Sequence, residues 1–396
     1  MTVKLAVNRR ITGIAAVSAL AVTLAACGGN GGGETTTAAE TTGTTEEVEE
    51  TEEAETTEAP EAGGEMDYSA LSGTIAGGGA SSMEKAQNGW IATFASEAPG
   101  VTVSYNPTGS SGGRTAFIEG TVQYAGTDSI VGDDQLAEME ASCQSDVLEL
   151  PLYVSPIAVI FNLPGIDSIN MTPETIANVF NGSITKWNDE AIAADNEGVD
   201  LPDLDIIPVN RFDGSGTTEN FTEYLSVAAA DAWTYEPADM WPIEGTQSGD
   251  GTSGLVDVVT STEGAIGYAD ASRAGGLGTV AVGVGEEFVS YSPEAAARIL
   301  EVSEPTESAT DLRLTYDLAR DTTESGTYPV VLVSYTLACT GYGDQETADA
   351  VKGYLTYVAS AEGQEVAADP DVAGIAPISD NVRTQVMAAI DQISAR

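Results

Sequence analysis

The chain has 396 residues, 42% of them hydrophobic, which is enough for two packed domains because single cores stop growing at about 250–300 residues. It carries 14 basic and 62 acidic residues, and its formal net charge of -48 repels nucleic acid and anionic membrane surfaces. It contains no histidine, which excludes every Ser-His-Asp arrangement and removes the usual general base and zinc ligand.

Residues 1–27 have the pattern of a secretory signal peptide. Basic residues precede a mainly apolar run at residues 11–26, which is too short to span a bilayer comfortably. The run ends in Leu-Ala-Ala before Cys27, and two glycines follow. This resembles the bacterial lipobox, in which the cysteine is diacylated and becomes the new N-terminus. We therefore expect lipid on Cys27 and an extracytoplasmic protein anchored to the membrane. The alternative is an ordinary signal peptide with an incidental cysteine.

Residues 28–67 form a low-complexity segment of Gly, Thr, Glu and Ala. Val48 and Met66 are its only sizeable apolar side chains, so the segment cannot bury enough surface to fold. A flexible coil of this length spans roughly 35 Å, and repulsion between the glutamates lengthens it. We expect a disordered acidic linker that lets an anchored domain reach a membrane partner.

From residue 68 onward, β-rich runs alternate with helical patterns, which favours an α/β fold with mainly parallel sheets. Residues 148–161 form an extended run that contains two prolines. Because proline disfavours a central position in a sheet, we expect this run to cross between domains, with a return between residues 271 and 333. The expected strands cover residues 73–76, 101–105, 153–161, 206–210 and 265–268, and the expected helices cover residues 82–95, 113–119, 173–180 and 218–226.

Two further cysteines, Cys143 and Cys339, lie at or near the ends of strand-like segments. Disulfides form and persist in proteins outside the cytoplasm, so we expect one bond between them. Two separate buried thiols are the alternative.

Four segments place glycine or small hydroxyl residues where a strand gives way to a helix. Such positions expose backbone N–H groups at the positive end of a helix dipole, which is a ready site for an anion. One such segment alone is usually only a helix cap. Four in one chain, with Arg211 in the last, indicate an anion-binding site. The segments are residues 76–82, 108–113, 125–129 and 210–218.

In this order, the four segments resemble the phosphate-binding subunit of bacterial high-affinity phosphate ABC importers, over nearly all of the chain from residue 73. The runs Arg211-Phe212-Asp213-Gly214-Ser215-Gly216-Thr217 and Gly109-Ser110-Ser111-Gly112-Gly113 carry the resemblance, and residues 184–189 and 264–268 support it. The resemblance implies the two-lobed type II periplasmic-binding-protein fold, α/β with mixed sheets flanked by helices and the ligand in the cleft. We expect lobe I to contain residues 68–152 and 290–396, and lobe II to contain residues 153–289.

The resemblance also implies a set of phosphate contacts. Asp128 would match the family's buried acceptor and Arg211 its single cationic contact, with Asp213 bracing the guanidinium from behind. This chain departs from the family at Ser82, where an aromatic residue is common, so a contact there would come from the backbone N–H. The full expected set is Ser81, Ser82, Ser110, Asp128, Arg211, Ser215, Gly216 and Thr217.

The chemistry of tetrahedral phosphate explains these residue types. Arg211 can form a bidentate, charge-assisted pair with two phosphate oxygens. Phosphate keeps at least one proton at neutral pH, and Asp128 can accept it. Fully deprotonated sulfate would instead leave the carboxylate facing an oxygen lone pair. The alternatives are a surface turn residue for Asp128 and a solvated cation at a strand end for Arg211.

We therefore expect a binding protein that captures inorganic phosphate and delivers it to an ABC transporter permease, with no metal, cofactor or nucleic-acid partner. A receptor for sulfate, molybdate or tungstate, or a surface phosphate sensor, is the alternative of the same class. A hydrolase using Ser110 or Ser215 is disfavoured because no histidine or nearby lysine could act as the base. A purely structural surface protein would explain the acidic segment but not the four loops.

Overall fold

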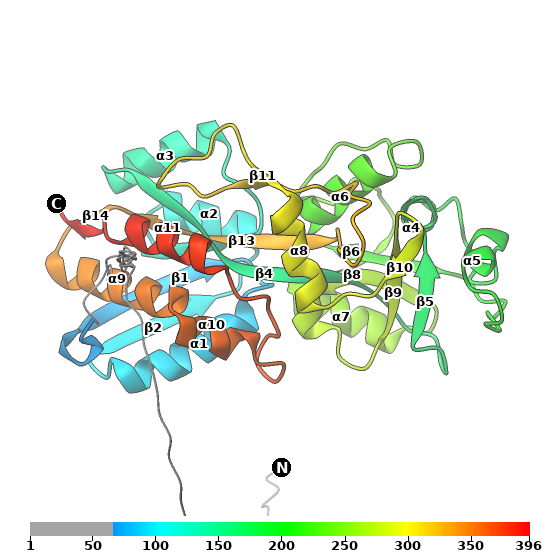
Figure 1. Cartoon of the computed structure of the whole chain (residues 1–396), viewed down its shortest axis with the longest axis horizontal. Coiled ribbons are helices and arrows are strands. Elements are labelled where there is room, and N and C mark those ends of the chain that lie inside the picture. Colours follow the sequence, from blue (N-terminus) through cyan, green and yellow to red (C-terminus); the bar gives the residue numbers. More distant parts are fainter. Residues whose placement is uncertain (1–65) are drawn as a thin grey trace, which may run out of the picture. The chain divides into compact units, whose positions relative to one another are not determined.

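The structure is a computed structural model that describes residues 66–396 (Figure 1). The predicted signal peptide, Cys27 and nearly all of the predicted linker lie outside the described residues. Within residues 66–396, no helix is both long and apolar enough to cross a membrane. Helices flank one branched sheet that contains both parallel and antiparallel pairs. The predicted α/β class is confirmed, but the expectation of mainly parallel pairing is not met, because one long strand pairs antiparallel with three neighbours.

The first half of the sheet is built on three parallel strands, each followed directly by a helix. The carboxyl ends of parallel strands lie at one edge of a sheet, so the three strand-to-helix loops lie side by side at that edge. A single 3-10 turn, η1 (Tyr68–Ala70), precedes them. The strands, in spatial order, are β2 (Val101–Asn106), β1 (Gly73–Gly79) and β3 (Tyr124–Thr127), and the helices, in chain order, are α1 (Glu84–Glu97), α2 (Ser110–Ile118) and α3 (Asp133–Cys143).

The second half repeats this arrangement with three more parallel strands, in the spatial order β8, β6, β7. The loops after them again meet at one edge. Three further strands branch from the sheet through β9, and two helices lie between β5 and β6 in the chain. The elements are β5 (Ser168–Met171), α4 (Pro173–Phe180), α5 (Glu190–Asp195), β6 (Ile207–Arg211), α6 (Gly216–Ala228), β7 (Gln247–Gly249), α7 (Gly251–Ser261), β8 (Ala265–Asp270), η2 (Ala271–Arg273), β9 (Gly278–Val284) and β10 (Glu287–Val289).

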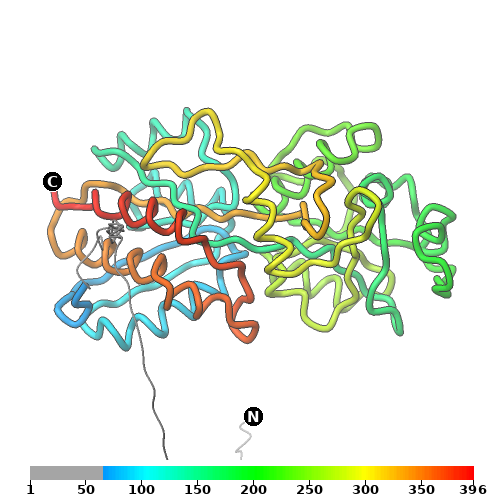
Figure 2. Tube along the Cα trace, viewed as in Figure 1, coloured from blue at the N-terminus to red at the C-terminus, as the bar shows by residue number. Residues whose placement is uncertain are grey.

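Strands β4 (Val147–Phe161) and β13 (Val331–Cys339) run between the two halves (Figure 2). Every residue of β4 is buried. β4 pairs with β13 as far as Pro156 and with β8 from Ile157 onward. The expected crossover is therefore a strand in the middle of the sheet, where prolines were expected to be disfavoured. Pro156 lies where the partner changes, and Pro151 lies beside an irregularity in the register with β13, so neither interrupts a regular ladder.

Residues 290–330, expected with the first lobe, contact both halves. Helix α8 (Pro293–Val302) packs on β4, and the backbone of Ala295 in this helix accepts a hydrogen bond from Tyr328. The chain then forms a two-stranded hairpin over the first half, held there by the buried ion pair of Arg313 with Glu149 at 2.8 Å. Burial raises the pKa of Glu149, although Arg313 and a backbone hydrogen bond from Val131 oppose the shift. The hairpin strands are β11 (Glu304–Pro305) and β12 (Tyr316–Asp317).

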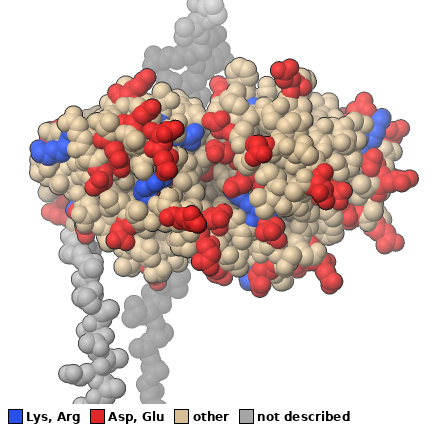
Figure 3. Space-filling model, turned by 90° about the horizontal axis from the view of Figure 1, so that it is seen from above, with Lys and Arg blue, Asp and Glu red and all other residues tan. Residues whose placement is uncertain are grey.

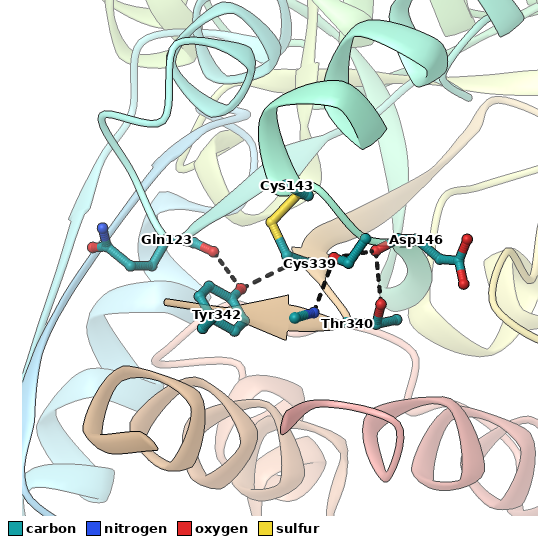
Figure 4. The surroundings of a disulfide bond; sticks show 8 residues. Gln123, Cys143, Asp146, Cys339, Thr340 and Tyr342 are labelled. Carbon is teal, nitrogen blue, oxygen red and sulfur yellow. Dashed lines mark hydrogen bonds between the residues drawn. A yellow bond between two sulfur atoms is a disulfide. The ribbon is translucent and has the colours of Figure 1, made fainter. Parts of the chain in front are cut away.

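The C-terminal segment returns to the first half, where α9 packs on β1 and α10 packs on α1. A disulfide joins Cys143 at the end of α3 to Cys339 at the end of β13, with 5.5 Å between their Cα atoms (Figure 4). Hydrogen bonds from Thr340 to the Asp146 carbonyl hold the chain beside it. The elements are β14 (Gly341–Tyr342), α9 (Gln345–Ala359), α10 (Ala361–Ala368), α11 (Asp380–Ile390) and β15 (Ser394–Ala395).

Candidate functional site

The four predicted loops come together where the two halves meet. Ser81 and Asp128 follow β1 and β3 of the first half, whereas Arg211 ends β6 and Thr217 lies in the first turn of α6 in the second half. The Thr217 hydroxyl donates to Asp128 Oδ2 at 2.9 Å, which joins the halves directly. All eight expected contact residues are buried, namely Ser81, Ser82, Ser110, Asp128, Arg211, Ser215, Gly216 and Thr217.

Asp128 lies at the centre of this group and is only 3% exposed. Its Oδ1 accepts hydrogen bonds from the hydroxyls of Ser82 and Ser334, both at 2.7 Å. Its backbone N–H donates to Ser110 Oγ at 3.1 Å, and its backbone oxygen accepts from Asn220 Nδ2 at 2.6 Å. Asp128 is therefore a buried carboxylate surrounded by donors and not a surface turn residue.

Ser82 acts differently from the expectation that only its backbone would matter. Its hydroxyl is the one that binds Asp128 Oδ1, while its backbone oxygen accepts from the Tyr153 hydroxyl at 3.3 Å. Ser82 thus places a donor on the buried carboxylate.

Arg211 is 3% exposed, so it is not a solvated cation. Asp213 holds its guanidinium in a fork, with Nε to Oδ1 at 2.7 Å and Nη2 to Oδ2 at 2.5 Å. Burial alone would raise the pKa of Asp213, but the hydrogen bonds and charge of Arg211 lower it overall. The fork does not engage Nη1, which lies 3.4 Å from Thr252 Oγ1.

The protein is strongly acidic, with a formal net charge of -48, whereas a site for an anion needs positive charge. Figure 3 shows acidic side chains spread over the visible face and only a few basic ones. The cations that could serve an anion, Arg211 and Arg114, are both buried below 10% exposure, where solvent and salt screen them least. Net charge therefore does not report on the chemistry of the site.

The start of α6 is tightly packed against the first half. A Cβ added to Gly216 would lie 2.7 Å from Ser110 Oγ and 2.8 Å from Asp128 Cβ, so only glycine fits here. Ser215 caps the helix, since its hydroxyl accepts from the Thr218 N–H at 3.2 Å. The Ser215 N–H donates to the Asp239 carbonyl at 2.9 Å, so the hydroxyl hydrogen of Ser215 is the donor that this residue could offer to a ligand.

The start of α2 holds a second buried cation, Arg114, which the sequence analysis did not single out. Its Nη1 donates to Thr127 Oγ1 at 2.9 Å and its Nη2 to Ser111 Oγ at 3.0 Å. Ser111 also donates to Asp239 across the cleft. Residues 109–113 match the G-x-S-x-G spacing of a hydrolase elbow with Ser111 at its centre, but a carboxylate and a guanidinium bind this hydroxyl and the chain has no histidine base.

Thr252, at the start of α7, is another residue that the sequence analysis missed. Its hydroxyl lies 3.0 Å from Ser81 Oγ, and its backbone N–H donates to the same atom at 3.1 Å. It therefore links the first-half loop to Arg211 of the second half. A signal was present, because residues 249–254 have the same glycine and hydroxyl composition at a strand-to-helix junction as the four segments that were recognised.

Strand β8 contributes two buried side chains beside the site, Tyr268 and Asp270. Tyr268 stacks on Phe221 with 4.4 Å between ring centroids, and its hydroxyl accepts from the Arg211 N–H at 3.3 Å. Asp270 is fully buried and accepts from the Tyr153 hydroxyl at 2.8 Å and the Ser272 N–H at 2.9 Å. Burial raises the pKa of Asp270 to about 6, although its hydrogen bonds oppose the shift.

A family model described as the PBP superfamily domain matches residues 33–362. The chain is 33% identical over 333 residues to the phosphate-binding protein PstS 3 of Mycobacterium leprae, covering 81% of this chain and 87% of that protein. The chain belongs to the PstS family within the PBP superfamily. A second PstS relative, the phosphate-binding protein PstS 2 of Mycobacterium tuberculosis, is 30% identical over 325 residues, with 80% and 86% coverage.

Solved structures give the same fold for this PstS-family chain. The structure of PfluDING, a high-affinity periplasmic phosphate-binding protein bound with phosphate, aligns with a TM-score of 0.64 over 80% of this chain and 93% of that one. At 19% identity, this likeness concerns the fold alone. The predicted periplasmic-binding-protein fold is thereby confirmed. The named relatives are phosphate-binding proteins and not enzymes.

Proposed function

We propose that this protein binds inorganic phosphate between its two halves, outside the cytoplasm, and delivers it to the permease of an ABC transporter. The observation that carries the proposal is the pairing of a buried acceptor, Asp128, with a buried cation, Arg211, at the starts of several helices. Arginine and helix-start donors suit an anion, and a carboxylate beside them suits an anion that carries a proton. Phosphate has both properties.

The proposed phosphate contacts are the eight residues expected from the sequence, with Asp213 bracing the Arg211 guanidinium. Thr252 joins this set on the strength of its contacts with Ser81 and Arg211. Helix starts and hydroxyls supply neutral donors, so Arg211 is the principal charge on the ligand. A receptor for another oxyanion or a phosphate sensor would use the same donors, and Asp128 separates phosphate from sulfate.

Titration calorimetry of residues 66–396 with phosphate and with sulfate tests the proposal. We expect saturable phosphate binding and sulfate binding that is weaker by several powers of ten, because sulfate leaves the buried carboxylate unpaired with a ligand proton. Equal affinity for both anions would replace phosphate capture with general oxyanion binding. Transport assays in cells with and without the permease then separate delivery from sensing.

We also propose that lobe I (residues 68–152 and 290–396) and lobe II (residues 153–289) close on the ligand as a hinged clamp, with residues 290–330 spanning both. Contacts across the cleft support a closed state. Four residues near the cleft, here termed the latch, pair Glu84 with Arg273 and Lys85 with the Ser272 carbonyl. With phosphate bound, X-ray scattering should give a radius of gyration that matches the closed structure. After phosphate is removed, the radius should be larger. An unchanged radius would favour a preformed pocket.

The membrane anchor is a separate proposal that rests on the lipobox pattern at Cys27. We expect Cys27→Ser protein to appear in the medium, with the wild type in the membrane fraction. If the variant stays with the membrane, the lipid anchor is wrong, whatever the phosphate affinity proves to be.

A further inference from the structure

Ser334 on β13 is a buried hydroxyl beside Asp128 that belongs to none of the four loops. It is fully buried, and its Oγ donates to Asp128 Oδ1 at 2.7 Å. The strand register explains this contact. β13 runs antiparallel to β3 and pairs Tyr335 with Thr127, the last residue of β3, so the next position on each strand brings Ser334 opposite Asp128.

The hydrogen bonds to Asp128 are divided unequally between its two oxygens. Oδ1 accepts from Ser82 and from Ser334, both at 2.7 Å. Oδ2 accepts from Thr217 alone among the described residues, at 2.9 Å. An ionised carboxylate offers about four acceptor positions, two on each oxygen. Two hydroxyls therefore fill Oδ1, and Oδ2 keeps one position for a further donor.

We propose that Ser334 is a specificity-determining positioning residue, which acts with Ser82 to saturate Oδ1 and leave a single acceptor position, on Oδ2, for a proton of the bound anion. Ser334 does not touch the ligand and acts through Asp128. This inference rests on the proposed phosphate function and adds the element that makes the carboxylate read one ligand proton.

Two hydroxyls on Oδ1 also fix the rotation of the carboxylate, so that the open acceptor position stays on Oδ2. Without Ser334, Oδ1 keeps only the hydrogen bond from Ser82 and gains an open acceptor position of its own. The carboxylate can then turn away from an anion that brings no proton, so sulfate is excluded less strongly.

The test measures the ratio of sulfate to phosphate dissociation constants by calorimetry at about pH 7. We expect Ser334→Ala to reduce the ratio by roughly tenfold or more, and Ser334→Thr to restore it by keeping the hydroxyl. Thr336→Val is the matched control. Thr336 lies on the same strand, is 1% exposed, and its hydroxyl has no hydrogen-bond partner in the part of the chain that the structure describes.

Ser82→Ala supplies a second variant if Ser334→Ala fails to fold. It removes the other donor to Oδ1, keeps the backbone N–H, and should lower the ratio in the same way. An unchanged ratio in the folded variants, or an equal loss for both anions, would overturn the role of Ser334 and leave phosphate binding intact. If wild-type protein does not prefer phosphate at all, the proposed function itself fails.

Discussion

Thr217 and Asp128 come from opposite halves of the protein, and the threonine hydroxyl donates to the carboxylate at 2.9 Å. A donor from one half therefore lies on the acceptor of the other. Because Asp128 is 3% exposed, water cannot readily replace a hydrogen bond that a ligand fails to make. The selectivity of the protein should therefore depend on this side chain more than on any other.

Replacing Asp128 by Asn should narrow the preference for phosphate over sulfate by about tenfold or more, each factor of ten being about 1.4 kcal/mol. The amide has a similar shape but adds a donor, so it can face an unprotonated oxygen. Phosphate affinity should fall only modestly. Calorimetry with both anions measures the ratio, and an unchanged ratio would remove Asp128 from recognition.

Arg211→Ala should weaken phosphate and sulfate together, because it removes charge and donors without sensing a proton. Arg211→Lys should recover little, since lysine cannot keep the fork that binds Asp213 through Nε and Nη2. The selectivity ratio is the readout that distinguishes this variant from Asp128→Asn. A large change in the ratio in Arg211→Ala would mean that the guanidinium also reads protonation.

The latch should contribute to affinity without affecting selectivity. Arg273 and Glu84 are partly exposed, at 25% and 31% of their side chains, and such pairs contribute about 0–1 kcal/mol. We expect Arg273→Ala to weaken both anions by no more than about fivefold by favouring the open state. Arg383→Ala, which breaks the exposed pair with Asp380 on α11, is the control. A double-mutant cycle with Glu84→Ala checks that the effect comes from this pair, and zero coupling would count against it.

Removing the disulfide should destabilise the protein by about 2–5 kcal/mol, because the bond closes a long loop in the unfolded chain. The two cysteines are 196 positions apart. Urea unfolding of the Cys143→Ser, Cys339→Ser double variant measures the effect, and peptide mass mapping of the oxidised wild type checks the bond. Two free thiols in the oxidised protein would contradict the structure at this point.

Stability should depend on pH through Asp270. The pKa of this carboxyl is about 6 in the folded protein and 3.8 ordinarily. Between these two pH values, the folded state holds a proton that the unfolded state has lost. This contribution is fully present below about pH 4 and is lost as the pH rises through about 6. As the pH rises from about 4 to about 6, the free energy of unfolding of Asp270→Asn should therefore increase by about 3 kcal/mol relative to that of the wild type. Urea midpoints across the range measure the gain, and parallel curves would show that Asp270 ionises normally.

Much of this architecture follows from local sequence. The helix predicted at residues 173–180 matches α4 (Pro173–Phe180), because Thr172 caps it and proline suits its first turn. The loops around Asp128 and Arg211 were recognisable because glycine and hydroxyl residues mark helix starts. Parallel pairing was overestimated, since nothing in the local pattern of β4 reveals its antiparallel partners.

The residues that were missed share one property, which is that their partners lie far away in the chain. Ser334 reaches Asp128 only through the register of β13 with β3, and Thr252 reaches Ser81 only when the two halves meet. Arg114 lay directly after a recognised loop, but its burial depends on Thr127 and Asp239. No spacing rule within one segment could have identified these contacts.

The position of the disulfide also has a consequence for proteolysis. Cys143 and Cys339 bracket all of lobe II together with α8 and the hairpin. A protease that cuts once anywhere between them produces two fragments that stay covalently joined. Such a nicked molecule would migrate as one species on a non-reducing gel and separate only after reduction. Cleavage of an exposed loop there need not release either fragment.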